Sequence, residues 1–221
     1  MPAAPRRKSA KRLPAPRFVR GVDDTRALLL AAARDVFLES GPANFSLREV
    51  ARRVGVSAAA VYRHFDGKDE LLFAACTQGF QVFSSYLVRA LAQATPLDRL
   101  LAMSEQYRAF GLENPLDYRF IFMSPSLEVK AGEHPRASSS AASALPQDST
   151  FRFLVDRVRE CVDAGILAAS DPEQLAVLIW AHVHGLVSLR LSGHLSPLGD
   201  DAGFAELYRA SVARLLRGLA G

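Results

Sequence analysis

Residues 46–72 read SLREVARRVGVSAAAVYRHFDGKDELL, a stretch that predicts two short helices and the start of a third. Ser46 and Glu49 match the S-x-x-E pattern of a capping box, in which each side chain accepts a hydrogen bond from the other's backbone N–H. Gly55 then interrupts the apolar pattern, and Ser57 offers an N-cap for a helix running to about Phe65. The stretch therefore predicts a helix, a turn of about four residues and a second helix.

An amphipathic helix is expected just before this pair. Its apolar residues recur at helical spacing, and Gly41-Pro42 ends it because glycine takes the left-handed cap and proline cannot continue. Three helices within residues 24–65, the last two joined at Gly55, have the layout of a helix-turn-helix, whose second helix enters the major groove of DNA. An ordinary helical hairpin has the same spacing, so spacing alone leaves both interpretations open.

The residue types in the second helix favour DNA binding. Val61 and Phe65 are four apart and are expected to face the first helix, which leaves as its exposed side Ala58, Ala59, Ala60, Tyr62, Arg63 and His64. Small residues let a helix approach base edges closely, and alanine suits a thymine methyl group. Tyr62 and His64 can hydrogen-bond to phosphate oxygens. Between Ser46 and Lys68, five basic side chains face two acidic ones, a local charge of +3.

This run resembles the N-terminal domain of the TetR family of bacterial regulators. The resemblance covers about residues 25–73 and rests on GVS at 55–57, VYRHF at 61–65, and Lys68 with the apolar pair that follows. It implies phosphate contacts and base readout by a set comprising Arg48, Ser57, Ala58, Ala59, Ala60, Tyr62, Arg63, His64 and Lys68. Because three alanines offer few hydrogen bonds, Arg48, Arg63 or the basic N-terminus is expected to carry more of the sequence specificity.

The whole chain is predicted to be all-α, with about nine helices in three parts. Residues 1–22 form a basic arm, 23–69 the helix-turn-helix domain, and 70–221 a larger effector-binding and dimerisation domain. Residues 124–149, rich in Ser, Ala, Pro and Gly, are expected to be a long connection. The next helix is expected to begin at about Thr150. The helix after Asp171-Pro172 is apolar on almost every side, which is typical of a helix in a core or subunit interface.

One motif in the larger domain resembles a subtype of the family named for a Trp-His-Gly signature: Trp180, His184 and Gly185, with Asn114–Tyr118 upstream. Trp180 and His184 share one helical face. Either they are a packed aromatic and a satisfied histidine, or they line a ligand pocket. The predicted effector-binding set comprises Phe83, Tyr107, Phe110, Tyr118, Phe122, Trp180 and His184. The resemblance also implies a homodimer formed through the last two helices, which would present two recognition helices to a pseudo-palindromic operator.

The net charge of +4 is unevenly distributed. Residues 1–22 hold seven basic side chains and no acid, so the remaining chain carries 4 − 7 = −3. Prolines among them predict a disordered segment. Such a segment is either a solvated leader or an arm that neutralises phosphates or enters a minor groove.

Composition is that of an ordinary soluble protein, with 49% hydrophobic and 23% charged residues. No apolar run approaches the roughly 20 residues of a membrane span, and no secretory signal is expected, which predicts a cytoplasmic protein. Cys76 and Cys161 fit no zinc spacing, and a redox-sensor role is the weaker interpretation. No catalytic, metal-binding or cofactor-binding pattern is present.

The expected function is a sequence-specific transcriptional regulator, a repressor that a small molecule releases from its operator. Four alternatives stay open: an activator, an enzyme with an unfamiliar all-α site, a nucleoid protein that binds DNA without sequence choice, and a regulator switched by a partner protein.

Overall fold

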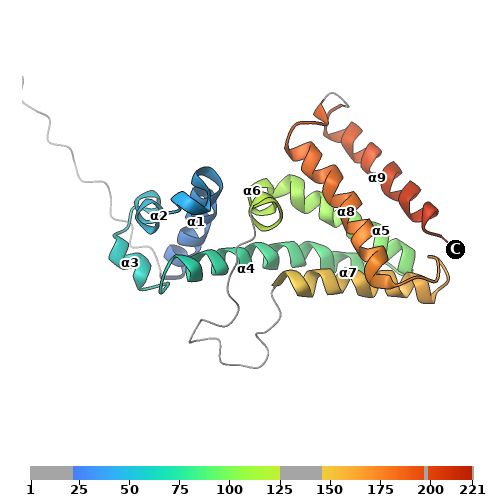
Figure 1. Cartoon of the computed structure of the whole chain (residues 1–221), viewed down its shortest axis with the longest axis horizontal. Helices are drawn as coiled ribbons and strands as arrows, with labels where there is room; N and C mark the ends of the chain where they lie inside the picture. Colours follow the sequence, from blue (N-terminus) through green and yellow to red (C-terminus); the bar gives the residue numbers. More distant parts are fainter. Residues whose placement is uncertain (1–21, 125–145, 197–198, 221) are drawn as a thin grey trace, which may run out of the picture.

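The computed structural model describes residues 22–124, 146–196 and 199–220, and these residues contain nine α-helices and no strand. The predicted basic arm, except Val22, and residues 125–145 of the predicted connection lie outside them. Figure 1 shows a long central helix, α4, with three helices gathered at its N-terminal end and the others packed along the rest of it. The all-α expectation is confirmed.

The first group comprises α1 (Val22–Asn44), α2 (Leu47–Val54) and α3 (Ala58–Tyr62). In α1 the helical backbone breaks at Gly41, where φ is 71° and ψ is 170°, and Pro42 follows. The predicted stop is therefore present, because the left-handed region is easily reached only by glycine. A hydrophobic core formed by α1, α2 and the residues around α3 packs against the start of α4.

The second group begins with α4 (Lys68–Leu87), which ends in a 3₁₀ turn, η1 (Val88–Ala92). It continues with α5 (Pro96–Glu113), α6 (Pro115–Tyr118) and a π-helical turn, η2 (Arg119–Met123). The remaining helices are α7 (Pro146–Asp163), α8 (Pro172–Leu191) and α9 (Asp201–Gly218). Asp171 caps α8 through a 3.0 Å hydrogen bond from the backbone N–H of Glu173, with Pro172 at the first helical position, as predicted.

Three local expectations need correction. Ser46 is the N-cap of α2, but the predicted capping box is absent. The N–H of Glu49 donates to the backbone carbonyl of Ser46 at 3.1 Å and not to its side chain, and the Glu49 carboxylate binds Arg52 and Arg53. The helix α3 ends at Tyr62 and not near Phe65. The helix α7 begins at Pro146, four residues before Thr150.

The expectation that no segment approaches a membrane span needs correction. In the described residues two helical segments are long and apolar enough by length and composition alone: Lys68–Ala92 and α8, each with a mean hydropathy of 1.3. In the first segment 44% of the 18-residue apolar stretch is buried, and the segment lies between the other helices. The second is only 28% buried, so much apolar surface on α8 faces outward.

Candidate nucleic-acid interface and effector cluster

The turn between α2 and α3 has the backbone that a helix-turn-helix requires. Gly55 adopts a left-handed conformation (φ 76°, ψ 32°), and its N–H bonds to the carbonyls of Ala51 and Arg52. The Ser57 hydroxyl then accepts a 3.2 Å hydrogen bond from the N–H of Ala60 and so caps α3. The helix α2 therefore ends at Val54 and α3 begins at Ala58, four residues later.

Two apolar side chains fix α3 against the rest of its domain, as predicted. Val61 is fully buried and Phe65 is 2% exposed, both within the core that includes α1. The guanidinium of Arg26, on α1, lies 5.2 Å from the centre of the Phe65 ring. These contacts orient the opposite side of α3 toward solvent.

The exposed side of α3 is narrower than expected. Ala59 and Arg63 are exposed, Tyr62 is 57% exposed, and Ala58 and His64 are partly exposed. The expectation that Ala60 is exposed is wrong, because it is 6% exposed. Three successive residues cover about 200° of a helix, so one of them must turn toward the core beside Val61.

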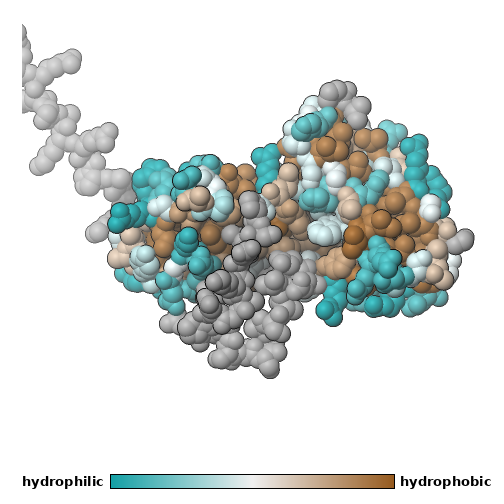
Figure 2. Space-filling view, viewed as in Figure 1, coloured by the Kyte–Doolittle hydropathy of each residue, from teal (hydrophilic) through white to brown (hydrophobic). Residues whose placement is uncertain are grey.

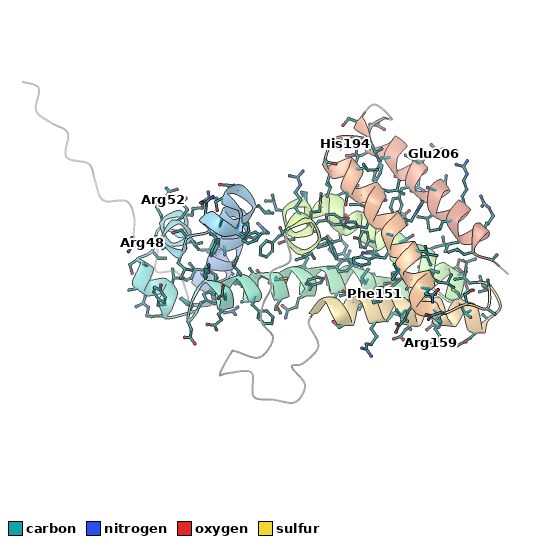
Figure 3. The ribbon with its side chains drawn as sticks, viewed as in Figure 1. Arg48, Arg52, Phe151, Arg159, His194 and Glu206 are labelled. Atoms are coloured by element: carbon teal, nitrogen blue, oxygen red, sulfur yellow. The ribbon has the colours of Figure 1, made fainter. Side chains whose placement is uncertain are left out.

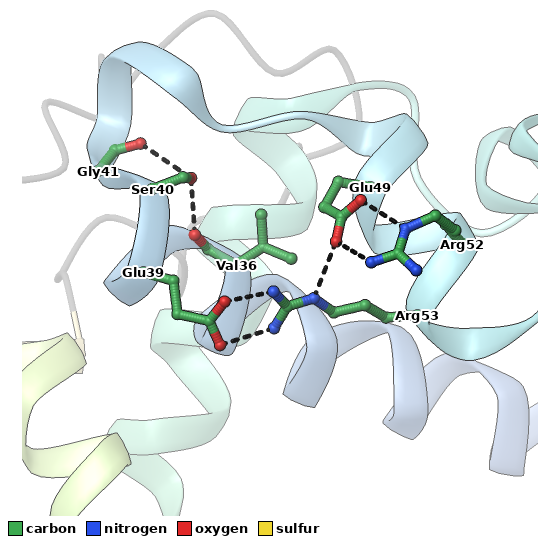
Figure 4. A network of polar contacts seen from close by, with 7 residues as sticks. All are labelled: Val36, Glu39, Ser40, Gly41, Glu49, Arg52 and Arg53. Atoms are coloured by element: carbon green, nitrogen blue, oxygen red, sulfur yellow. Dashed lines mark hydrogen bonds and ion pairs between the residues drawn. The ribbon is translucent and has the colours of Figure 1, made fainter.

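The five basic side chains between residues 46 and 68 fall into two kinds. Arg52 and Arg53 form ion pairs with Glu49, and Arg53 also pairs with Glu39 of α1 (Figure 4). In the described part of the chain no acidic side chain pairs with the others, which are Arg48, Arg63 and Lys68. Figure 3 shows Arg48 at the end of the molecule formed by α2 and α3. These cations are therefore available to a negatively charged partner.

All seven predicted effector residues meet in one aromatic cluster. Phe83 of α4 lies 5.0–5.5 Å, between ring centroids, from aromatic side chains of α5 and η2. Tyr118 lies 5.2 Å from Phe122 and stacks on His184 at 5.7 Å. Trp180 closes the cluster at 6.1 Å from His184. The side chains of Phe83, Tyr107, Phe110 and Tyr118 are buried, whereas Trp180 is 37% exposed.

Polar atoms in this cluster converge on one imidazole. The hydroxyl groups of Tyr107 and Tyr118 both lie 2.9 Å from Nδ1 of His184, and Trp180 Nε1 donates to the Tyr107 hydroxyl at 3.3 Å. Ser188 lies 3.2 Å from Nε2 of the same ring. Burial lowers the pKa of His184 and raises that of both tyrosines, so the ring and the phenols are neutral at physiological pH.

Sequence reasoning missed two members of this region. Ser188 lies one turn after His184 on α8, and Phe151 of α7 lies 6.0 Å from Trp180. Phe151 also lines an open groove of about 490 Å³. The other groove residues come from the start of α8 and its N-cap: Asp171, Glu173, Gln174, Val177 and Leu178. None of the seven predicted residues lines this groove.

The other candidate residues are His182 and the two cysteines. His182 bonds to Ser211 of α9 at 2.9 Å and points away from His184, as expected for residues two apart on a helix. Burial raises the pKa of Cys76 to about 11 and raises that of Cys161. Thiols that stay protonated are poor nucleophiles, which argues against a redox sensor.

The fold and the exposed second helix of the pair define the class of the protein: a two-domain, all-α protein with an N-terminal helix-turn-helix. Residues 29–75 match the family model described as bacterial regulatory proteins, tetR family, and residues 100–215 match the one described as tetracyclin repressor-like, C-terminal domain. The second match spans more than half of the chain, so the protein belongs to the TetR family. The Trp-His-Gly subtype stays a prediction.

Individual relatives agree with this assignment. The chain is 30% identical to the probable HTH-type transcriptional regulator ArpR of Pseudomonas putida over 185 residues, which are 80% of this chain and 86% of ArpR. It is 37% identical to the HTH-type transcriptional repressor Rv3405c of Mycobacterium tuberculosis over 78 residues, only 35% of this chain and 39% of that protein. A solved protein of unknown function from Rhodococcus sp. RHA1 is 26% identical, with a TM-score of 0.67 over 93% of this chain and 99% of that one.

Proposed function

We propose that the protein is a sequence-specific DNA-binding transcriptional regulator, a repressor that leaves a pseudo-palindromic operator when a small molecule binds its larger domain. The observation that carries the proposal is the exposed face of α3, with Tyr62 and Arg63 in solvent beside unpaired Arg48 and Lys68. Membership of the TetR family supports it.

The surface of this domain suits duplex DNA. Ala58 and Ala59 at the start of α3 let the helix backbone approach base edges. The guanidinium of Arg63 can donate to a guanine edge, while Tyr62 and Lys68 suit phosphate oxygens. Arg48, near the N-terminus of α2, supplies a further cation. Phosphate contacts would fix the orientation of α3, and Arg48 and Arg63 would supply most of the sequence discrimination.

Exposed apolar side chains on α8 support a homodimer through the last two helices. Val177 is 49% exposed, Leu178 52% and Leu189 43%, and Leu207 of α9 is 36% exposed. Figure 2 shows hydrophobic surface over the half of the molecule that holds α8 and α9. Clustered apolar surface of this kind is typical of a subunit interface. Two-fold symmetry would then set the recognition helices about 34–36 Å apart, one turn of DNA.

The aromatic cluster supports an uncharged effector. Its contacts among the described residues are rings, two phenol hydroxyl groups, an indole N–H, a hydroxyl and a neutral imidazole. In that part of the chain they include no carboxylate, ammonium or guanidinium group. A neutral ligand with an apolar ring and a hydrogen-bonding group could replace the contacts of the tyrosines with His184. Opening the cluster around Phe122 and Trp180 would make room for it, since both side chains are only partly buried.

Two connections between the domains support coupling of effector and DNA binding. The first is α4, which contributes Leu71 and Leu72 to the core of the DNA-binding domain and Phe83 to the aromatic cluster. The second is the turn from α6 into η2. Its Tyr118 belongs to the cluster, whereas Phe120, two residues later, belongs to the core of the DNA-binding domain. An effector that displaced Tyr118 would therefore act on α1 as well as α4.

The test is selection of bound duplexes from a random pool, followed by titration of the winner against scrambled DNA. Recovery of an inverted repeat, bound by two subunits and preferred by roughly 10³ or more over scrambled DNA, is the expected result. Binding without enrichment of any sequence would favour a nucleoid protein and overturn the proposal. Release of the selected duplex by compounds, and not by a cell protein, distinguishes the effector from a partner protein.

A further inference from the structure

Four charged side chains, Glu39, Glu49, Arg52 and Arg53, form a chain of ion pairs that joins α1 to α2 (Figure 4). The Glu49 carboxylate accepts hydrogen bonds from Arg52 Nε at 2.7 Å and Nη2 at 2.6 Å, so this pair is bidentate. It also accepts one from Arg53 Nε at 3.2 Å. Both terminal nitrogens of Arg53 donate to Glu39, one at 2.8 Å. Two cations are thus matched by two anions, and the net charge of the network is zero.

The position of Arg52 makes its ion pair with Glu49 relevant to DNA binding. Arg48 and Arg52 are four residues apart on α2 and therefore lie on the same side of the helix. Figure 3 shows both side chains at the end of the molecule formed by α2 and α3. The side chain of Arg52 is 71% exposed, so an approaching phosphate has access to it. Arg53 differs, because its side chain is 29% exposed and is held between α1 and α2.

Glu49 opposes a phosphate contact by Arg52 in two ways. It occupies two of the donor nitrogens that a phosphate oxygen would take. Its own negative charge lies next to the same guanidinium and repels a phosphate there. The Arg52 and Arg53 hydrogen bonds lower the pKa of Glu49 to about 2, so the carboxylate stays ionised throughout the physiological range.

We infer that Glu49 is a masking residue: it withholds Arg52 from the DNA backbone and so limits sequence-independent binding by the helix-turn-helix. Under this inference the phosphate contacts come from Lys68 and the uncharged donors, together with Arg48 and Arg63 where these do not read bases. The inference rests on the proposed function, because it concerns the same DNA-binding surface. Loss of the Glu49 charge would add one phosphate contact in each subunit.

The experiment measures the affinity of the full chain for a random duplex as a function of salt concentration. For Glu49→Gln, the slope of log affinity against log salt should become steeper by about 0.9 per subunit, with tighter binding at low salt. The matched control is Asp156→Asn. Asp156 pairs with Arg159 on α7 at 2.9 Å with the same three-residue spacing, and Figure 3 shows Arg159 far from the DNA-binding end. This control should leave the slope unchanged.

Two further variants test whether Arg52 is the cation that becomes free to bind phosphate when the Glu49 charge is removed. Arg52→Ala alone should leave the slope unchanged, since Arg52 contacts no phosphate in the parent protein. Glu49→Gln combined with Arg52→Ala should lose the gain of Glu49→Gln. Circular dichroism melting establishes that each variant is folded. Arg52→Ala keeps the inference falsifiable even if Glu49→Gln is unstable, because it leaves the contacts of Glu49 with Arg53 in place.

Three results would overturn the inference: no change in slope for Glu49→Gln, an equal change for Asp156→Asn, or a slope lowered by Arg52→Ala alone. Each of these leaves the proposed function standing if the parent protein still selects an inverted repeat. Failure of the parent protein to select any sequence would instead remove the proposed function, and the slopes on random DNA would still report on Glu49.

Discussion

Phe37 of α1 and Phe120 of η2 pack edge to face, with ring centroids 5.4 Å apart and ring planes at 83°. Beside them, Arg34 of α1 donates a 2.7 Å hydrogen bond to Asp117 of α6, and the side chains of this ion pair are 20% and 22% exposed. A segment that belongs to the larger domain in sequence thus completes the core of the DNA-binding domain. The two domains share side chains as well as the helix α4.

Replacing Phe120 with alanine should therefore destabilise the DNA-binding domain. Phe120 is 2% exposed, and truncation of a buried phenylalanine costs roughly 3–5 kcal/mol. Urea denaturation followed by circular dichroism measures the decrease in the free energy of unfolding. The control is Met123→Ala in the same turn, where the side chain is 42% exposed and the decrease should be much smaller. Equal effects of the two substitutions would contradict the assignment of Phe120 to this core.

Lys68→Ala should remove one phosphate contact from each subunit. Its ammonium group pairs with no acidic side chain in the described residues, so it is free to bind DNA. The salt slope of operator binding should become shallower by about 0.9 per subunit, and the affinities for operator and random duplex should fall alike. Arg159→Ala, which removes the same charge from α7, should leave both quantities unchanged. A fall in operator affinity alone would mean that Lys68 reads sequence.

Substitution of Gly185 with glutamate should produce a folded monomer. A Cβ atom at Gly185 would meet no atom within 4 Å, so the single chain has room for a side chain there. The same position lies on the exposed apolar side of α8, where a charge would be buried in a dimer at high cost. Light scattering after gel filtration reports the mass. Gln81→Glu, which adds the same charge on the exposed side of α4, should stay dimeric; a dimeric Gly185→Glu would place the interface elsewhere.

Stability should fall as the pH drops below about 6.5, the ordinary pKa of histidine, and His184 should account for part of the fall. In the folded protein, burial lowers the pKa of His184 below its ordinary value of 6.5. The unfolded chain therefore binds a proton at a higher pH than the folded one. Proton uptake by the unfolded state favours unfolding. Urea denaturation at pH 7.5 and pH 5.5 should show a smaller difference for His184→Gln than for the parent. A matching difference in both proteins would be inconsistent with a buried, neutral His184.

Deletion of residues 1–20 should weaken DNA binding. Residues 1–22 carry seven basic side chains and no acid, and the removal of each phosphate contact should reduce the salt slope by about 0.9. Titration at several salt concentrations measures both effects. An unchanged slope would leave the segment as a solvated leader without a role in binding.

Short-range patterns predicted the DNA-binding domain well, because its helices are set by interactions within a few residues. Gly55 and Ser57 end one helix and start the next through backbone conformation and a local cap. The spacing of Val61 and Phe65 predicted that both are buried, although Phe65 lies beyond the end of α3. The same patterns predicted the start of α8 at Asp171-Pro172. The burial of Ala60 was missed although helical spacing accounts for it: three successive residues cover about 200°, so the one next to Val61 turns toward the core.

The residues of the aromatic cluster were predicted individually, but their chemistry depends on contacts between separate helices. The position of His184 Nδ1 between the hydroxyl groups of Tyr107 and Tyr118 is set by how α5, α6 and α8 cross. Helical spacing fixes which residues share a face and carries no information on which face of another helix they meet.

The class of fold, the helix-turn-helix and the types of residue at both sites thus follow from the sequence, because helical period and capping act locally. The pairing of Glu39 with Arg53 and the packing of Phe120 on Phe37 follow from the tertiary structure alone. Both join segments that are distant along the chain. Such contacts form only where the packing of whole helices brings the two side chains together, and no local pattern encodes that crossing.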